Sequence, residues 1–170
     1  MCGEEEIRGY IDQIKNGSLQ EKRGAVDSLA GCGEPAAILL CEFIEESGDN
    51  DSMWYAASAL AKIGVAAIGP LSDLLKSTPS RDAKKYAAAA LGAIGEPSID
   101  ILLEMLSGDD KVVRGYASQA LIRVGEPAVQ PLKDLIDNSD GVVERCAVLT
   151  LHRMGTVEPE AVENVLRKDF

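Results

Sequence analysis

The residues with side chains suited to catalysis or metal binding are few and scattered along the chain. There is one histidine, His152, and there are four cysteines, Cys2, Cys32, Cys41 and Cys146, with no CxxC pair among them. Zinc sites need several Cys or His ligands at characteristic spacings, so the usual zinc frameworks are not supported. We also find no nucleophile elbow, no phosphate-binding glycine loop and no identifiable pair of catalytic carboxylates. The sequence therefore predicts no metal, no cofactor and no catalytic residues, and it favours a protein that is not an enzyme.

The remaining reactive groups have ordinary structural interpretations. Asp49 and Asp51 stand in the linker SGDNDS, which lacks the later glycine and the terminal glutamate of an EF-hand loop, so we interpret this stretch as a helix N-cap. His152 falls near the end of a predicted helix, where a polar or positive residue suits the helix dipole. Cys32 occupies an apolar core position, and Cys41 falls on an exposed helix face with no nearby base. We expect all four cysteines to be free thiols.

Composition and charge restrict the class of partner. The chain has 170 residues, 46% of them hydrophobic, which suffices for a buried core in one domain. Its N-terminus shows no secretory signal, and we find no run of apolar residues long enough for a membrane span, so we expect a cytoplasmic protein. A formal net charge of −11 repels phosphate groups, which disfavours nucleic acid and anionic membranes. Basic protein surfaces are the partners that this charge favours.

The elements that position these residues follow from an internal repeat. Four segments are similar to one another, for example AAAALGAIGEPSIDILLEML and ASQALIRVGEPAVQPLKDLI, and a fifth follows more loosely. Three columns of residues keep their spacing in all five copies at intervals of 31, 31, 30 and 30 residues. The alanine column is Ala25, Ala56, Ala87, Ala117 and Ala147; the leucine column is Leu29, Leu60, Leu91, Leu121 and Leu151; the glycine column is Gly33, Gly64, Gly95, Gly125 and Gly155.

Each column has a physical interpretation. Alanine and leucine four residues apart lie on one face of a first helix, helix A, and the glycine ends that helix in a left-handed conformation. Glu-Pro follows in three copies and fits the start of a second helix, helix B. The buried positions of helix B are predicted to be Leu40, Phe43 and Ile44, then Leu71, Leu74 and Leu75, then Leu102, Met105 and Leu106, then Leu132, Leu135 and Ile136, and finally Val162, Val165 and Leu166. Pro70 and Pro131 lie four residues into helix B, so we expect a bent or late first turn there.

The N-terminal segment 1–18 fits the same scheme as a single helix B, with Ile7, Tyr10 and Ile14 in the buried columns, that caps the first repeat. The predicted fold is all-α, an α-α superhelix or solenoid of about eleven helices without strands, since one helix pair cannot bury both of its apolar faces alone. We predict a single domain, 1–170, with repeats at about 19–48, 49–79, 80–109, 110–139 and 140–170.

The pattern A-x-x-A-L-x-x-I-G-E-P-A resembles the HEAT-like repeats named after phycobilin lyases. The stretch VVRGYASQALIRVG matches it best, and the resemblance runs from about residue 19 to 166. It implies a solenoid but not one function, because the family includes adaptors, lyase subunits, a hydroxylase and DNA-repair enzymes.

Two of these activities conflict with the residues of this chain. Deoxyhypusine hydroxylase holds iron with repeated His-Glu pairs, whereas His152 is the one histidine here and Arg153 follows it. The HEAT-like DNA glycosylases present a basic surface, which a net charge of −11 opposes. A phycobilin lyase-like subunit within an enzyme complex has no short signature to check, and it remains the alternative function.

The predicted docking site is the exposed face of the B helices, which lines the concave groove of such a solenoid. If the core positions are as stated, the residues three, six, seven and ten after the proline column face outward. The predicted partner-binding residues are Ile38, Glu42, Glu45, Asp73, Lys76, Asp100, Leu103, Glu104, Lys133, Asp134 and Asp137, and Cys41, Ser72, Gly69 and Gln130 are expected on the same face. The position seven after the column is acidic in four repeats.

Two hypotheses follow for this face. It is either an acidic groove for a basic protein or peptide, with Ile38 and Leu103 as apolar anchors, or a charged solvent face that keeps the protein soluble. Self-association through the groove or the chain ends is a further possibility. Trp54, in a column otherwise polar or small, is either a contact hot spot or a cover for the preceding linker, and we favour the second. Tyr55, Tyr86 and Tyr116 are predicted to pack between repeats.

Overall fold

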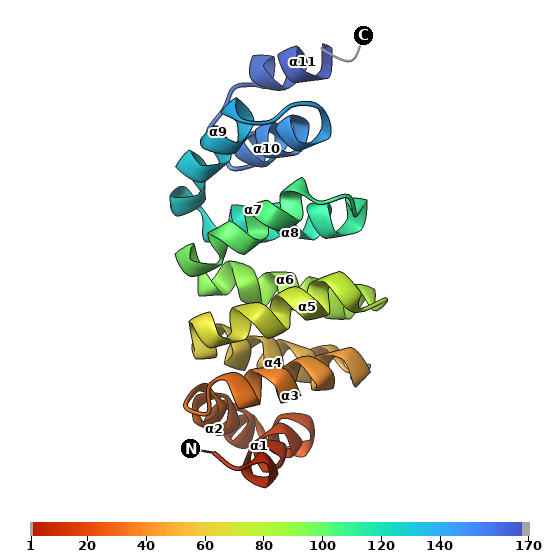
Figure 1. Cartoon of the computed structure of the whole chain (residues 1–170). Helices are drawn as coiled ribbons and strands as arrows, with labels where there is room; N and C mark the ends of the chain where they lie inside the picture. Colours follow the sequence, from red (N-terminus) through yellow and green to blue (C-terminus); the bar gives the residue numbers. More distant parts are fainter. Residues whose placement is uncertain (1, 168–170) are drawn as a thin grey trace. The chain divides into compact units, whose positions relative to one another are not determined.

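Residues 2–167 are described by the computed structural model, and within them the chain forms eleven α-helices, three short 3-10 helices and no strand (Figure 1). The α-helices are α1 (Glu4–Asn16), α2 (Leu19–Ala30), α3 (Glu34–Glu46), α4 (Asn50–Ile63), α5 (Ile68–Ser77), α6 (Arg81–Ile94), α7 (Ile99–Ser107), α8 (Lys111–Val124), α9 (Val129–Asp137), α10 (Gly141–Arg153) and α11 (Pro159–Arg167). The prediction of an all-helical chain of about eleven helices is confirmed.

The chain divides into two units, Met1–Ile94 and Gly95–Phe170, which we describe separately. The division falls inside the third repeat, between its helix A and its helix B. That the whole chain behaves as one domain stays a prediction.

The first unit has two layers of helices. One layer, the A layer, contains α2, α4 and α6, in which α4 contacts both neighbours. The other, the B layer, contains α1, α3 and α5, in which α3 contacts α1 and α5. Contacts of α1 with α2, of α3 with α4 and of α5 with α6 join the layers. The N-terminal helix α1 therefore packs against both helices of the first repeat, α2 and α3, and its role as a cap stays a prediction.

The second unit repeats this arrangement. Its A helices α8 and α10 contact each other, and so do its B helices α7 and α9. Contacts of α7 with α8 and of α9 with α10 join the layers, and α11 packs on α10.

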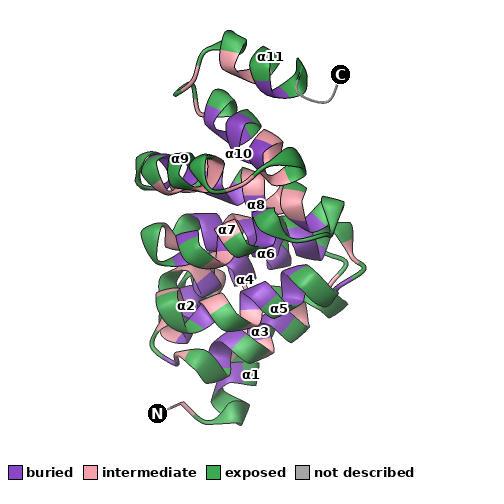
Figure 2. Ribbon diagram, turned by 45° about the horizontal axis from the view of Figure 1, so that its top comes forward, coloured by how far each residue is buried: buried purple, intermediate pink, exposed green. Residues whose placement is uncertain are grey.

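The core lies between the layers of each unit, as the buried residues in Figure 2 show. Every member of the alanine column and every member of the leucine column is at most 1% exposed. The small alanine side chain lets neighbouring A helices approach closely, while the leucine fills the space between layers. These two columns are confirmed as core positions.

The glycine column follows the A helices with a backbone conformation that other residues avoid. Gly64 and Gly125 cap α4 and α8 directly, whereas α2 and α10 end before Gly33 and Gly155, with Gly31 and Met154 as their cap residues. All five glycines have positive φ, between 64° and 85°. For the first four, ψ lies between −146° and −132°. This is more extended than the left-handed helical conformation that we predicted, and it is essentially restricted to glycine. The predicted need for glycine is confirmed, with a different ψ.

Three of the B helices begin late. α3 starts directly at Glu34, whereas 3-10 helices at Gly64–Ala67, Glu96–Ser98 and Glu126–Ala128 precede α5, α7 and α9. We predicted this for the helices that contain Pro70 and Pro131. Because α7 also begins late and has Ile101 at the equivalent position, the internal proline is not the whole cause.

The predicted core of the B helices holds best in the first three repeats, where only Phe43 is half-buried. Leu135 and Ile136 in α9 and Val162 in α11 are half-buried. Leu166 is 47% exposed, so its prediction as a core residue is wrong. As the last helix, α11 has no following repeat among the described residues to cover its second face.

The N-terminus carries a disulfide that the sequence pattern did not predict. Cys2 and Cys32 are bonded, with 5.3 Å between their Cα atoms, and Cys41 and Cys146 are free thiols. The expectation of four free thiols is therefore wrong. Although 30 residues separate the two cysteines, α1 folds back on α2 and brings its start to the end of that helix.

One segment among the described residues, Asn50–Ser77, meets a length and hydropathy test for a membrane-spanning helix, with a mean hydropathy of 1.3. It consists of α4, the 3-10 helix Gly64–Ala67 and α5, and it is broken at Gly64, where φ is 74°. Core helices of soluble proteins pass the same test, so the result is weak evidence for a span.

Candidate functional site

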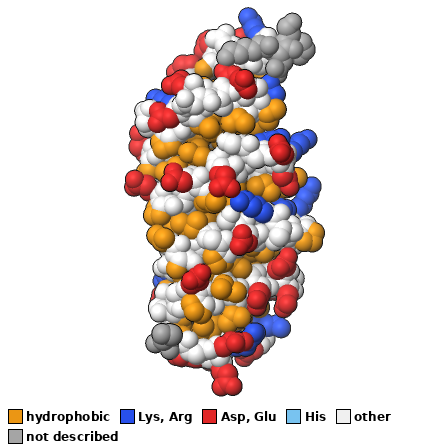
Figure 3. Space-filling model, viewed as in Figure 1, with side chains coloured by type: hydrophobic (Ala, Val, Ile, Leu, Met, Phe, Trp, Pro, Cys, Tyr) orange, Lys and Arg blue, Asp and Glu red, His pale blue; other side chains and the backbone are white. Residues whose placement is uncertain are grey.

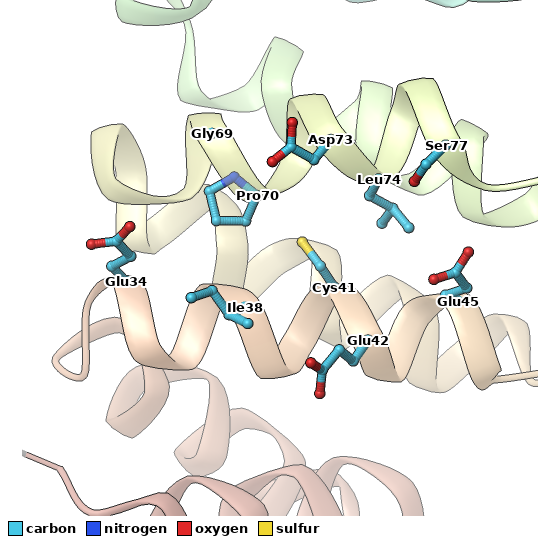
Figure 4. Close-up of a pocket in the computed structure, with 10 residues that line it drawn as sticks. All are labelled: Glu34, Ile38, Cys41, Glu42, Glu45, Gly69, Pro70, Asp73, Leu74 and Ser77. Atoms are coloured by element: carbon cyan, nitrogen blue, oxygen red, sulfur yellow. The ribbon is translucent and has the colours of Figure 1, made fainter.

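A hollow of about 390 Å³ lies between α3 and α5 on the B layer of the first unit (Figure 4). α3 contributes residues to it at a spacing of three or four, so these side chains follow one face of the helix. The lining residues are Glu34, Ile38, Cys41, Glu42 and Glu45 from α3, and Gly69, Pro70, Asp73, Leu74 and Ser77 from α5.

The hollow is acidic at its edges and apolar at its base. Four carboxylates border it, and none of the ten lining residues is basic. All four, on Glu34, Glu42, Glu45 and Asp73, are exposed. Within residues 2–167 none of them forms an ion pair. These four carboxylates are therefore free to bind a positively charged group.

The apolar part of the hollow comes from both helices. Ile38 is 46% exposed, and Pro70 and Leu74 lie opposite on α5. Figure 3 shows the same face with acidic side chains standing among apolar ones over the α3 and α5 region. The prediction that Ile38 is an exposed apolar residue among acids is confirmed.

Two residues expected on this face are buried instead. Cys41 is 7% exposed and Ser72 is 4% exposed. Their position, six after the proline column, is only about 60° around the helix from the buried position nine, so it lies at the edge of the apolar stripe. In Figure 4 the Cys41 thiol points into the space between α3 and α5.

The surroundings of Cys41 suppress its reactivity. Burial, followed by the negative charges of Asp73, Glu42 and Glu45, raises the pKa of the Cys41 thiol to about 12. Because the thiolate is the nucleophile, this thiol is poorly reactive near neutral pH. The hollow therefore offers a negatively charged surface for binding but no activated nucleophile.

A second hollow of about 400 Å³ lies between α1 and α3, and Glu42 borders both hollows. Its charges are mixed, because Arg8 and Lys15 of α1 stand among three acids. The predicted docking site did not include α1, although the alignment of this segment with the B helices already placed it in the same layer.

The other predicted site residues lie outside the α3–α5 hollow. Lys76 is exposed on α5, and in the second unit Asp100 and Glu104 on α7 and Lys133, Asp134 and Asp137 on α9 are exposed, with Leu103 half-buried. α7 and α9 contact each other, and Gln130 donates a hydrogen bond of 2.8 Å to Asp134. Glu42 and Asp73 thus share one hollow, while Glu104 and Asp134 stand on adjacent helices of the other unit. Their role in binding stays a prediction.

The A layer of the first unit carries a different surface. Trp54 is 56% exposed and its ring meets the Tyr55 ring edge-on at 4.9 Å. Both line a hollow of about 400 Å³ between α2 and α4, with Arg23, Val26, Asp27, Ser58 and Lys62. No residue of the linker before α4 lines this hollow, so the structure does not support our preferred interpretation of Trp54 as a linker cover.

The tyrosine ladder joins neighbouring repeats as predicted. The Tyr86 hydroxyl donates to the Asn50 side chain at 3.3 Å, and the Lys22 ammonium lies 5.4 Å from the centre of the Tyr55 ring. Both tyrosines are buried, and Tyr116 is half-buried.

The remaining polar candidates have the structural roles that we expected. Asp49 caps α4 by accepting a hydrogen bond of 2.9 Å from the Ser52 amide. His152 is exposed one residue before the end of α10, with Nδ1 3.2 Å from the carbonyl oxygen of Val157. No group of metal-ligating side chains occurs within the part of the chain that the structure describes.

The stacked helix pairs define an α-helical repeat protein with a charged surface on its B helices. A family model for HEAT repeats matches residues 39–122 and 99–168, so the chain belongs to the HEAT repeat family. Proteins of this kind commonly bind other proteins or peptides. The match is to HEAT repeats in general, and the finer resemblance to phycobilin lyases stays a prediction.

Solved structures that are similar to the chain are distant in sequence. One is the crystal structure of an engineered protein, 18% identical over 95% of this chain and 84% of that chain, with a TM-score of 0.38. Another is a computationally designed armadillo repeat protein for modular peptide recognition, 18% identical over 95% and 87% of the two chains, with a TM-score of 0.34. No curated protein matches the chain in sequence.

Proposed function

We propose that this protein is a non-enzymatic interaction module that binds a basic segment of a partner protein on its B helices. The observation that carries the proposal is the α3–α5 hollow, in which four unpaired carboxylates surround an apolar base that includes the exposed Ile38.

The chemistry of the hollow suits a lysine or arginine side chain. Such a side chain can lay its aliphatic stem on Ile38 and Leu74 while its charged end stays near Glu42, Glu45 and Asp73. A net charge of −11 also attracts a basic partner at long range, which speeds association. Solubility alone explains exposed acids, whereas the docking proposal also gives a role to Ile38, which is 46% exposed among them.

The test uses two labelled synthetic peptides, one alternating lysine with alanine and one alternating glutamate with alanine. We expect the lysine peptide alone to raise fluorescence anisotropy, and its affinity to fall as salt is added. In the variant Glu42→Lys/Asp73→Lys two attractions become repulsions. At about 0.2 to 1 kcal/mol for each exposed pair, loss of the two attractions alone should raise the Kd roughly 2- to 30-fold, and the new repulsions should raise it further.

The matched control is Asp109→Lys/Glu158→Lys, which makes the same charge change at two exposed acids of the second unit. It should lose affinity only through the change in net charge, by much less than the hollow variant. Equal loss in both variants would show that the peptide senses only overall charge, and the proposed site would be wrong.

A further inference from the structure

The A layer of the first unit has an exposed surface whose charge is opposite to that of the α3–α5 hollow. Its centre is Trp54 on α4, and the same column holds Arg23 on α2 and Lys85 on α6, the two neighbours that α4 contacts. A large aromatic residue that is 56% exposed between two cationic residues is not explained by packing or by helix capping.

The lining of the Trp54 hollow suits an apolar side chain. Val26, Tyr55 and Trp54 supply its apolar walls, and the Tyr55 ring meets Trp54 edge-on and fixes one wall. Exposed tryptophan residues in shallow hollows are typical hot spots of protein interfaces, because they bury a large area with little loss of side-chain freedom.

The charges around the Trp54 hollow indicate which residues should flank that apolar residue in a bound segment. Asp27 forms an ion pair with Lys62, so Arg23 is the one charged lining residue of the hollow without an oppositely charged partner there. Arg23 has no ion pair or hydrogen-bonded partner within residues 2–167. Lys85, at the same column position on α6, adds a second positive charge, and its ammonium lies 5.1 Å from the centre of the Tyr86 ring.

We infer that the A layer of the first unit is a second docking surface, which binds a peptide segment with an apolar residue flanked by acidic residues. The apolar side chain enters the hollow beside Trp54, and the flanking carboxylates meet Arg23 on one side and Lys85 on the other. A long polyanion suits this surface less well, because it would also meet the field of a chain with a net charge of −11. With this surface the protein can join a basic partner on its B layer to an acidic partner on its A layer.

Trp54 is the one tryptophan of the chain, so its fluorescence reports on this surface directly. The probe is a synthetic peptide with a leucine flanked by glutamates, and the control peptide has lysines in place of the glutamates. We expect the acidic peptide to shift the Trp54 emission to shorter wavelength, whereas binding of the control peptide to the α3–α5 hollow leaves the emission unchanged.

Variants separate this surface from general charge effects. Arg23→Glu/Lys85→Glu should raise the Kd for the labelled acidic peptide at least about fourfold. Trp54→Ala, measured by anisotropy, should raise it at least about tenfold, because it removes the side chain at the centre of the surface. The matched control Lys111→Glu/Arg123→Glu changes two exposed basic residues of the second unit that lie outside both proposed docking surfaces, and it should have a much smaller effect. Circular dichroism confirms that each variant keeps its helix content.

Three results would overturn the inference. The first is an acidic peptide that leaves the emission of Trp54 unchanged. The second is an emission shift that appears on raising the protein concentration alone, which would assign the surface to a second copy of the chain. The third is a shift caused by anionic lipid vesicles but not by the peptide.

Discussion

Gly125 and Gly115 belong to the same repeat, but replacing each by alanine should change the free energy of unfolding in opposite directions. Gly125 follows the last residue of α8 with φ 79° and ψ −140°, whereas Gly115 lies in the interior of α8. At both positions the methyl group of an alanine would meet no atom within 4 Å, so steric clashes do not contribute. Replacement by alanine therefore tests backbone conformation alone.

The magnitudes follow from that conformation. Forcing alanine into the backbone of Gly125 costs about 1 to 3 kcal/mol, of which the lower entropy of the unfolded chain offsets about 0.4 to 1 kcal/mol. Gly115→Ala should raise the free energy of unfolding by about 0.5 to 1 kcal/mol, because glycine is a poor helix former. The unfolded-state contribution is the same in both variants, so the difference between them isolates the folded state.

The assay is urea unfolding monitored by circular dichroism, with thermal unfolding as a second measurement. For a chain of this size each kcal/mol shifts Tm by about 2 to 4 °C. Gly125→Ala should lower Tm and Gly115→Ala should raise it. A Gly125→Ala variant as stable as Gly115→Ala would refute the explanation of how glycine ends α8.

Two other predictions concern the cysteines. Reduction of the disulfide, or Cys2→Ser, should lower the free energy of unfolding by up to about 3 to 4 kcal/mol, because the bond joins residues 30 apart in sequence. A thiol count on the denatured, unreduced protein checks the bond itself. Two reactive thiols would confirm it, and four would contradict it. Cys41, with its pKa raised to about 12, should react with iodoacetamide at pH 8 much more slowly than the half-buried Cys146. Peptide mass spectrometry measures the two rates. Equal rates would show that the hollow does not suppress formation of the Cys41 thiolate.

Much of the fold was predictable because the repeat supplies the same evidence several times. The A helices begin at Leu19, Asn50, Arg81, Lys111 and Gly141, each within one residue of a predicted repeat start. Alanine and leucine columns mark buried faces wherever both neighbours of a repeat are present. At the end of the chain this reasoning failed for Leu166, because no further repeat among the described residues covers that face of α11.

The candidate site was predictable in outline but not in detail. Helical spacing placed Ile38, Glu42 and Asp73 on the exposed face correctly, but it could not decide how far a neighbouring helix would cover Cys41. The Cys2–Cys32 bond was missed because pairing depends on how α1 folds back on α2, which spacing alone does not specify. The Trp54 hollow needs the contact of two helices from different repeats, so only its central residue was visible in the sequence.

The central claim is that a basic segment binds in the acidic hollow between α3 and α5. The most direct test is an NMR titration of isotope-labelled protein with the lysine-alanine peptide, in which the chemical shifts of the backbone amides are monitored. The account predicts shifts concentrated at Ile38, Glu42 and Glu45 of α3 and at Asp73 and Leu74 of α5. Shifts spread evenly over all exposed acids, or confined to helices other than these two, would contradict it.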